Sequence, residues 1–273
     1  MQSMTVTAAS PTAANAWTAV GTITVPAGAK SIKKVKVNAI SDAGVAAATT
    51  HFAPVVRLLG SGLEEQSPHE YVAPGSNVPL IAATAGYAIA ETNFLEYDVD
   101  IGVSVGGVID IQALAITEVQ TGQVSVQLDF SPEPAGGKNS MSQYVTAAIG
   151  AVNTWVTVGT ITIPKPGAGS EPKAIKEIVC GVVPDVAATA VSEMVSTRFR
   201  MSGAGIAEGG THEYLGNSAG NGCVVTGPGA YRDTIVRHRL KVPINAGGQI
   251  LVEQRVDTEV PDGGDAVFGV LYE

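Results

Sequence analysis

The chain has 273 residues, 45% of them hydrophobic and only 5% aromatic, and it carries a formal net charge of −9 at pH 7. This composition suffices to bury a core in each of two domains of ordinary size, and it excludes a chain that is disordered throughout. Lys and Arg do not cluster among aromatic residues, so the chain lacks the basic surface typical of a nucleic-acid-binding protein.

Short β-strands are the elements that the sequence predicts. Val, Ile, Thr and Ala supply the apolar content, and 32 Gly and 15 Pro residues supply turns, which together favour an all-β fold. In chain order, alternating apolar and polar residues predict strands in the first half at 4–8, 17–25, 31–39, 52–59, 69–73, 79–83, 93–104, 107–116 and 123–130. The Ala-rich residues 41–50 are predicted to form a loop or a single helical turn.

The second half of the chain repeats the first. Residues 17–24 recur as 155–162 at an offset of 138, and the His-Glu-Tyr triplet of residues 69–71 recurs at 212–214 at an offset of 143. The sequence therefore predicts two tandem homologous antiparallel β-sandwiches of the jelly-roll kind, produced by an internal duplication. They are copy one (residues 1–131) and copy two (residues 140–273), joined by a Pro/Gly-rich linker (residues 132–139).

One predicted strand carries opposite charges in the two copies. The acidic row of copy one consists of Glu96, Asp98 and Asp100, and the basic row of copy two, at an offset of 141, consists of Arg237, Arg239 and Lys241. Because alternate residues of a strand share a face, each trio lines one side of its strand. Opposite charges on equivalent surfaces suit a head-to-tail contact, so we predict that both rows lie at contacts between domains or subunits. Two independently solvated strand faces are the alternative.

The repeated His-Glu-Tyr triplet is the only duplicated constellation that could do chemistry. A His and a carboxylate can bind a metal or move protons, but adjacent residues of a strand point to opposite faces, so a structural role is favoured. The equivalent Arg57 and Arg200 are predicted to pair with a carboxylate of their own copy, such as Glu65 and Glu208, and not to bind a ligand.

Enzymatic function finds little support in the residues present. A two-domain cupin-like enzyme would need a His-x-His pair, and the histidines are His51, His69, His212 and His238, which form none. The sequence contains no nucleophile elbow in a strand-to-helix context, no phosphate-binding loop and no zinc-spaced cysteines. We therefore predict a protein that is not an enzyme, with no catalytic residue, no cofactor and no metal ligand.

The cysteines and the chain start indicate where the protein is made. Cys180 replaces Val37 of copy one within a strand, which suits a buried thiol better than half of a disulfide with Cys223. Neither an export signal nor a run of about 18 apolar residues that could span a membrane is visible. We expect synthesis in a reducing cytoplasm.

An acidic chain of two fused β-sandwiches with complementary faces resembles the virion structural proteins of viruses and phages, in particular the tandem or double jelly-roll coat proteins. The resemblance lies in architecture and composition over the whole chain. It implies a non-enzymatic protein located in the virion that self-assembles with copies of itself and with other virion proteins, commonly as trimers with pseudo-sixfold symmetry. The compact copies leave a capsid, decoration or cement, tail or fibre role open.

A carbohydrate-binding or adhesin-like pair of sandwiches is the second interpretation. Such a module would expose a row of aromatic residues as a sugar platform. Trp17 and Trp155 lie at equivalent strand starts, which favours a role in packing for both. A degenerate cupin-like enzyme is the third interpretation.

Overall fold

The structure is a computed structural model, and it describes residues 2–9, 15–41, 54–65, 68–72, 93–115, 122–136, 142–148, 150–164, 173–184, 197–216, 235–257 and 264–272. The named elements within these residues are β-strands, as the sequence predicts. In the part of the chain so described, no helix has the length and apolar character needed to span a membrane.

Eight strands belong to copy one. They are β1 (Gln2–Ala9), β2 (Thr18–Thr24), β3 (Ser31–Ser41), β4 (Pro54–Leu59), β5 (His69–Val72), β6 (Asn93–Gly102), β7 (Val108–Ala115) and β8 (Gly122–Ser131). They confirm the predicted strands of copy one to within two residues at each end. The predicted strand at 79–83 and the Ala-rich residues 42–50 lie outside the described residues.

Eight further strands belong to copy two. They are β9 (Ser142–Ala148), β10 (Val156–Thr162), β11 (Ala174–Pro184), β12 (Thr197–Ser202), β13 (Thr211–Leu215), β14 (Ile235–Pro243), β15 (Gln249–Val256) and β16 (Gly264–Tyr272).

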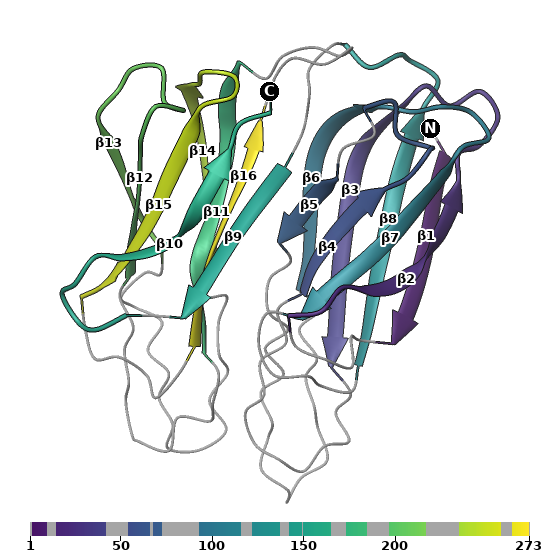
Figure 1. Cartoon of the computed structure of the whole chain (residues 1–273). Helices are drawn as coiled ribbons and strands as arrows, with labels where there is room; N and C mark the ends of the chain where they lie inside the picture. Colours follow the sequence, from purple (N-terminus) through teal and green to yellow (C-terminus); the bar gives the residue numbers. More distant parts are fainter. Residues whose placement is uncertain are drawn as a thin grey trace, which may run out of the picture.

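Each copy contains two four-stranded antiparallel sheets. In copy one the strand orders are β1-β8-β3-β6 and β2-β7-β4-β5, and in copy two they are β9-β16-β11-β14 and β10-β15-β12-β13. Replacing each strand of copy one by its counterpart eight strands later gives the sheets of copy two. The two sandwiches stand side by side, with β9 on the side of copy two that faces copy one (Figure 1). The fold is two tandem antiparallel β-sandwiches.

Alternation of side chains explains how each sandwich closes. In copy one, Val124, Val126 and Leu128 on β8 are fully buried, as are Ile109 and Ile111 on β7. These residues are spaced by two, so one face of each strand enters the core and the intervening residues point away from it. Both sheets contribute to one hydrophobic cluster in each copy.

Side-chain contacts repeat with the strands. Trp17 precedes β2 with the Arg57 guanidinium 4.1 Å from its ring centroid, and Trp155 precedes β10 with the Arg200 guanidinium at 4.3 Å. A β-bulge interrupts the pairing of β2 with β7 and of β10 with β15 at equivalent places. The prediction that these Trp and Arg residues occupy equivalent positions in the two copies is confirmed.

A glycine of the tight turn after β4 gives the first testable prediction. Gly60 has a φ of 110°, and a Cβ placed on it would lie 2.6 Å from the carbonyl oxygen of Val108. Gly60→Ala is therefore expected to lower the free energy of unfolding by about 2 kcal/mol, from backbone strain and the clash together. Gly28→Ala is the control, because its φ of 82° brings strain while no atom lies within 4 Å of the added carbon. If urea unfolding shows that both variants lose the same free energy of unfolding, the prediction that the clash destabilises Gly60→Ala is contradicted.

Candidate functional site

The contact between the two copies is the most elaborate site among the described residues. Strand β16 has both faces buried: Phe268 and Val270 enter the core of copy two, while Val267 and Leu271 join the hydrophobic cluster of copy one. Copy one therefore covers the outer face of the sheet β9-β16-β11-β14. We call this contact, including the polar residues described below, the interdomain contact.

On copy one the interdomain contact is made by an edge, where β5 and β6 end their sheets. Tyr71, Val72 and Tyr97 form the edge cluster of copy one, and all three are buried. The two tyrosine rings pack with their centroids 5.0 Å apart, and the Tyr97 hydroxyl donates to the Val72 carbonyl oxygen. A Cβ added to Gly269 of β16 would lie 3.2 Å from Val72 Cγ2, so Val72 packs against copy two at a position that has no side chain.

Burial defines the chemistry of the edge cluster. It raises the pKa of both Tyr71 and Tyr97 well above the ordinary value, so both hydroxyls stay neutral. The neighbouring Ser142 side chain of copy two lowers the pKa of Tyr71 by a smaller amount. The edge cluster therefore binds copy two by the packing of neutral groups, and it does not supply a proton donor near neutral pH.

Arg237 anchors copy two to this edge. Its Nε and Nη2 donate to Glu177 Oε1 at 2.8 and 2.5 Å, and its Nη1 donates to the backbone oxygen of Glu96 at 2.9 Å. The guanidinium carbon lies 5.0 Å from the centroid of the Tyr97 ring, which is a cation–π geometry. Next to it, the Lys176 ammonium donates to the backbone oxygen of Asp98 at 3.0 Å. Cations of copy two thus meet carbonyl groups and an aromatic ring of copy one.

The carboxylates of the acidic row are held within copy one. Glu96 is bound by Lys34 and Lys36, and Asp100 by Lys33 at 2.5 Å. The hydrogen bond from Lys34 lowers the pKa of Glu96. The Asp98 side chain is 73% exposed, with an oxygen 3.6 Å from Lys34 Nζ.

The basic row differs from residue to residue. Arg237 reaches copy one as described, whereas Arg239 and Lys241 are exposed. That the rows serve as a contact between subunits stays a prediction.

Aromatic packing extends the interdomain contact along β9. Tyr144 meets the Trp17 ring edge-on, with centroids 6.2 Å apart and an interplanar angle of 80°. Burial raises the pKa of Tyr144 to about 12. The Arg57 guanidinium lies over the ring of Trp17, which is half-buried, so the residue takes part in packing.

The sequence could have identified this covered face, although the prediction overlooked it. The run at 266–272 is continuously apolar apart from Gly269, whereas its counterpart at 124–130 alternates apolar and polar residues. A continuous apolar strand is typical of burial on both faces, and an alternating strand of burial on one. The difference between the copies is the signal that copy two carries a covered sheet face.

The histidines of the two His-Glu-Tyr triplets lie in different surroundings. His69 is fully buried with Nε2 3.8 Å from Glu65 Oε2, while His212 of copy two is half-buried. Over the described ranges, no group of three or more His, Cys, Asp and Glu side chains could hold a metal ion. His51 lies outside those ranges, and so does Cys223, while Cys180 is buried and its thiol pKa is raised by that burial.

Arg200 pairs with a carboxylate of its own copy, as predicted, but the named partners Glu65 and Glu208 were wrong. Arg57 donates to Gln112 Oε1 at 2.7 Å, and Arg200 binds both carboxylate oxygens of Glu253 at 2.6 and 2.9 Å. The reason is strand pairing: Gln112 and Glu253 lie directly opposite the two arginines on β7 and β15, whereas Glu65 and Glu208 lie beyond the strands.

Glu65 makes stability depend on pH. Burial, followed by the neighbouring Glu64 carboxylate, raises its pKa from 4.5 to about 7. Between these values the folded chain holds a proton that the unfolded chain has lost, so the free energy of unfolding is expected to fall as pH rises from 4.5 to 7. Because the side chain is partly exposed, we expect a loss of only about 1–2 kcal/mol. Urea unfolding of Glu65→Gln across this range should show a flatter profile; an unchanged slope would contradict the assignment.

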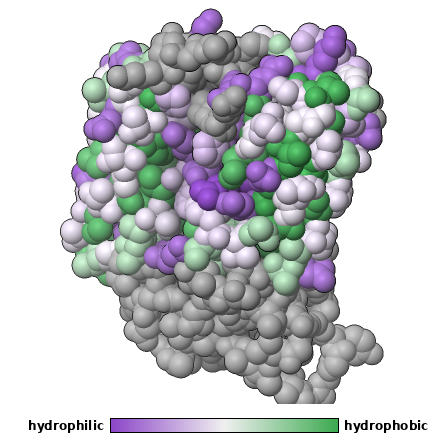
Figure 2. All heavy atoms as spheres, turned by 45° about the vertical axis from the view of Figure 1, so that its right-hand side comes forward, coloured by the Kyte–Doolittle hydropathy of each residue, from purple (hydrophilic) through white to green (hydrophobic). Residues whose placement is uncertain are grey.

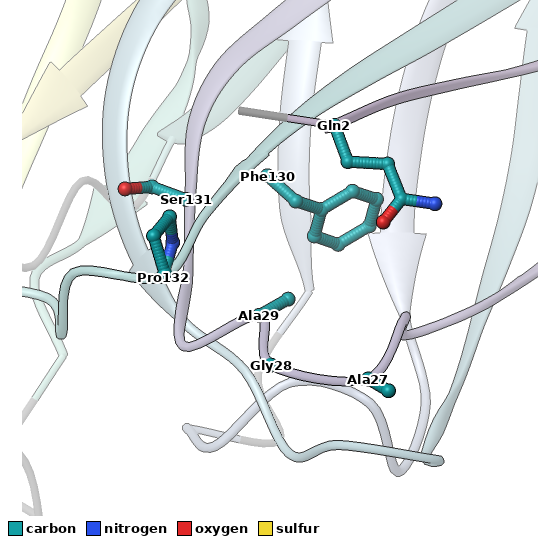
Figure 3. Close-up of a pocket in the computed structure, with 7 residues that line it drawn as sticks. All are labelled: Gln2, Ala27, Gly28, Ala29, Phe130, Ser131 and Pro132. Atoms are coloured by element: carbon teal, nitrogen blue, oxygen red, sulfur yellow. The ribbon is translucent and has the colours of Figure 1, made fainter.

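A shallow pocket of about 220 Å³ lies at one end of copy one, lined by Gln2, Ala27, Gly28, Ala29, Phe130, Ser131 and Pro132 (Figure 3). None of these side chains is charged, so the pocket offers no site for acid–base catalysis. On the face of the molecule shown in Figure 2, hydrophilic residues gather near the middle, between hydrophobic and weakly polar ones. The interdomain contact remains the site with the most specific geometry.

Comparisons with known proteins give similarity at the level of the fold. No protein-family model matches the chain, and no curated protein matches it. Among solved structures, the chain is similar to the major capsid protein of Sulfolobus Turreted Icosahedral Virus, with 11% identity, 100% of this chain and 96% of that chain covered, and a TM-score of 0.47. It is also similar to the major capsid protein P2 of bacteriophage PM2, with 11% identity, coverage of 99% and 97%, and a TM-score of 0.41. The glycosylasparaginase PNGase F of Flavobacterium meningosepticum matches with 11% identity, coverage of 99% and 96%, and a TM-score of 0.35.

Proposed function

We propose that the chain is a non-enzymatic structural protein of a virion, which assembles with copies of itself and with other virion proteins. The building blocks in this proposal are copy one (residues 1–131) and copy two (residues 140–273), and residues 132–139 link them. The finer proposal is a trimer in which six similar sandwiches form a ring with pseudo-sixfold symmetry.

The heterologous geometry of the interdomain contact is the observation that carries the proposal. An edge of copy one lies on a sheet face of copy two, so the contact does not use the same surface twice. A contact of this kind between homologous units can be repeated from unit to unit, and it yields a closed ring when the rotation closes. An isologous contact uses the same surface on both partners, so it would join two units and leave no such surface for a third.

Size measurements on the full chain test the proposal. We expect mass photometry of the purified protein to show trimers, and negative-stain microscopy to show rings or larger assemblies. Closed shells from the chain alone would indicate a shell protein, whereas binding only to preformed particles would indicate a decoration or cement protein. A monomer at every concentration and salt condition, with no binding to particles, would overturn the proposal.

The two alternatives are tested separately. A carbohydrate-binding pair would show glycan binding that Trp155→Ala abolishes, yet the Trp155 ring is covered by the Arg200 guanidinium. A cupin-like enzyme would contain stoichiometric zinc, iron, manganese or nickel on elemental analysis, and we expect none.

A further inference from the structure

Copy two contains a second version of the edge that copy one uses in the interdomain contact. Tyr214, Leu215 and His238 form the edge cluster of copy two, at the positions of the copy-one cluster. The rings of Tyr214 and His238 pack 5.5 Å apart at 47°, compared with 5.0 Å and 51° for the two tyrosines of copy one. His238 Nε2 lies 2.7 Å from the Leu215 carbonyl oxygen, where copy one has a tyrosine hydroxyl on the equivalent carbonyl. The docking geometry is thus built twice.

The edge cluster of copy two is uncovered within the described residues. Leu215 is 61% exposed, whereas its counterpart Val72 is 2% exposed beneath copy two. Along β13, residues alternate between exposed and half-buried, whereas three of the four residues of β5 are buried. A single exposed apolar side chain is ordinary on a protein surface. What indicates an interaction surface is that Leu215 stands on an edge built like that of copy one, whose equivalent residue Val72 is covered.

Copy one has the sheet face that matches this edge. The strand registers give each residue of this face an equivalent on the covered face of copy two. Ser125 is equivalent to Val267, and Gln127 to Gly269. This outer face of the sheet β1-β8-β3-β6 includes Thr5, Thr7, Lys36, Glu96, Ser125 and Gln127. These residues are exposed or half-buried.

Hydrogen bonds order this face in advance. Gln127 Nε2 and Ser3 Oγ donate to Asp129 Oδ1 at 2.7 and 2.6 Å, and Lys36 Nζ lies 3.1 Å from Asp129 Oδ2. Although burial alone would raise the pKa of Asp129, these bonds lower it. The face is therefore a fixed polar surface whose buried charge is already compensated.

The central residues of the pairing differ on both sides when edge and face are exchanged between the copies. Within the chain, the cation Arg237 of the face lies on the Tyr97 ring of the edge. In the second pairing, the carboxylate of Glu96 takes the place of Arg237, and the imidazole of His238 takes the place of Tyr97. A cation on an aromatic ring is replaced by a carboxylate beside an imidazole, a pair that is attractive when the imidazole is protonated. The face and the edge have thus changed together.

We propose that the edge cluster of copy two docks on the outer face of copy one of a second chain. The inference rests on the proposed function and adds to it the surfaces that join one chain to the next. Because Ser125 and Gln127 replace an apolar residue and a glycine, the contact between chains buries less apolar surface than the interdomain contact. It is consequently the weaker and more reversible of the two.

Two variants of the full chain and a control test this pairing. Leu215→Glu damages the edge only. The double variant Thr5→Arg with Gln127→Arg damages the face only, because it places two charged side chains where the apolar Leu215 would pack, while arginine can still donate to Asp129. Val105→Glu is the matched control: Val105 is 57% exposed in the turn between β6 and β7 and belongs to neither surface. Urea unfolding of each variant verifies that the chain stays folded.

The expected result is directional. Mass photometry measures the protein concentration at which half of the chains are assembled. The edge variant and the face variant each raise this concentration at least tenfold, and the control leaves it unchanged. An equimolar mixture of the two damaged variants forms a 1:1 dimer and nothing larger, because only one intact edge and one intact face remain.

Three results would overturn the inference. If Leu215→Glu assembles like the control, assembly uses another surface while the proposed function stands. If the mixture forms no dimer, the two surfaces are not partners. If the unaltered chain never assembles, the proposed function fails and this inference fails with it.

Discussion

Replacing Arg237 by alanine is expected to lower the free energy of unfolding by about 3 kcal/mol. The physical reason is that the substitution leaves a buried carboxylate without its ion-pair partner. Glu177 is 6% exposed, and Arg237 pairs with it. Breaking a buried pair costs about 3–5 kcal/mol, and the partly exposed guanidinium places this variant at the lower end. The loss also removes the cation from the Tyr97 ring and the donor from the Glu96 carbonyl.

Arg239→Ala is the matched control for that prediction. Arg239 lies two residues further along the same face of β14 and is exposed, so its removal should change stability by no more than about 0.5 kcal/mol. Urea unfolding followed by circular dichroism measures both variants. Adding Glu177→Leu to Arg237→Ala should recover part of the loss, since no buried charge then remains. Equal effects of the two alanine variants would show that Arg237 does not anchor the copies.

Val267→Asp is expected to cost about 3–5 kcal/mol, the largest effect of a single substitution predicted for this chain. Val267 is fully buried and packs in the hydrophobic cluster of copy one, so the new carboxylate would lie between the copies without a partner. We expect the copies to separate, and calorimetry to resolve two unfolding transitions where the unaltered chain shows one.

The duplication provides the control for Val267→Asp. Ser125→Asp places the same carboxylate at the equivalent position of copy one, which is half-buried on an uncovered face. Its cost should stay near 1 kcal/mol, including the lost contact between the Ser125 and Thr7 hydroxyls. Similar losses for the two variants would mean that copy one does not cover this face in solution.

Local patterns carried most of the fold prediction. Period-two alternation placed every strand of copy one that the structure describes, because alternation reflects which face of a strand enters its own core. The repeated Trp and Arg residues showed which positions of copy one are equivalent to which positions of copy two. These signals lie within short stretches or repeat at constant offsets, so a single sequence contains them.

Partners that come from distant strands could not be predicted in this way. The acidic row suggested carboxylates turned toward another domain, yet Lys34 and Lys36 on the neighbouring strand β3 hold Glu96. Similarly, Glu177 of β11 holds Arg237. Which charge a side chain meets depends on strand order, and strand order in a sandwich is set by long-range pairing that residue spacing does not show.

The start of the linker is tied to copy one, and this affects how the protein folds. The Gly136 amide donates to Asp100 Oδ2 at 2.7 Å, and the Ser31 hydroxyl donates to the Glu133 carbonyl at 2.7 Å. The linker is thereby bound to copy one as far as Gly136, and β9 begins soon after it at Ser142, which keeps copy two at high local concentration next to its own copy one. Exchange of copy two with a neighbouring chain is disfavoured for the same reason, since a swapped arrangement needs a longer hinge. The two copies are therefore expected to pair during the folding of a single chain, before any second chain is met.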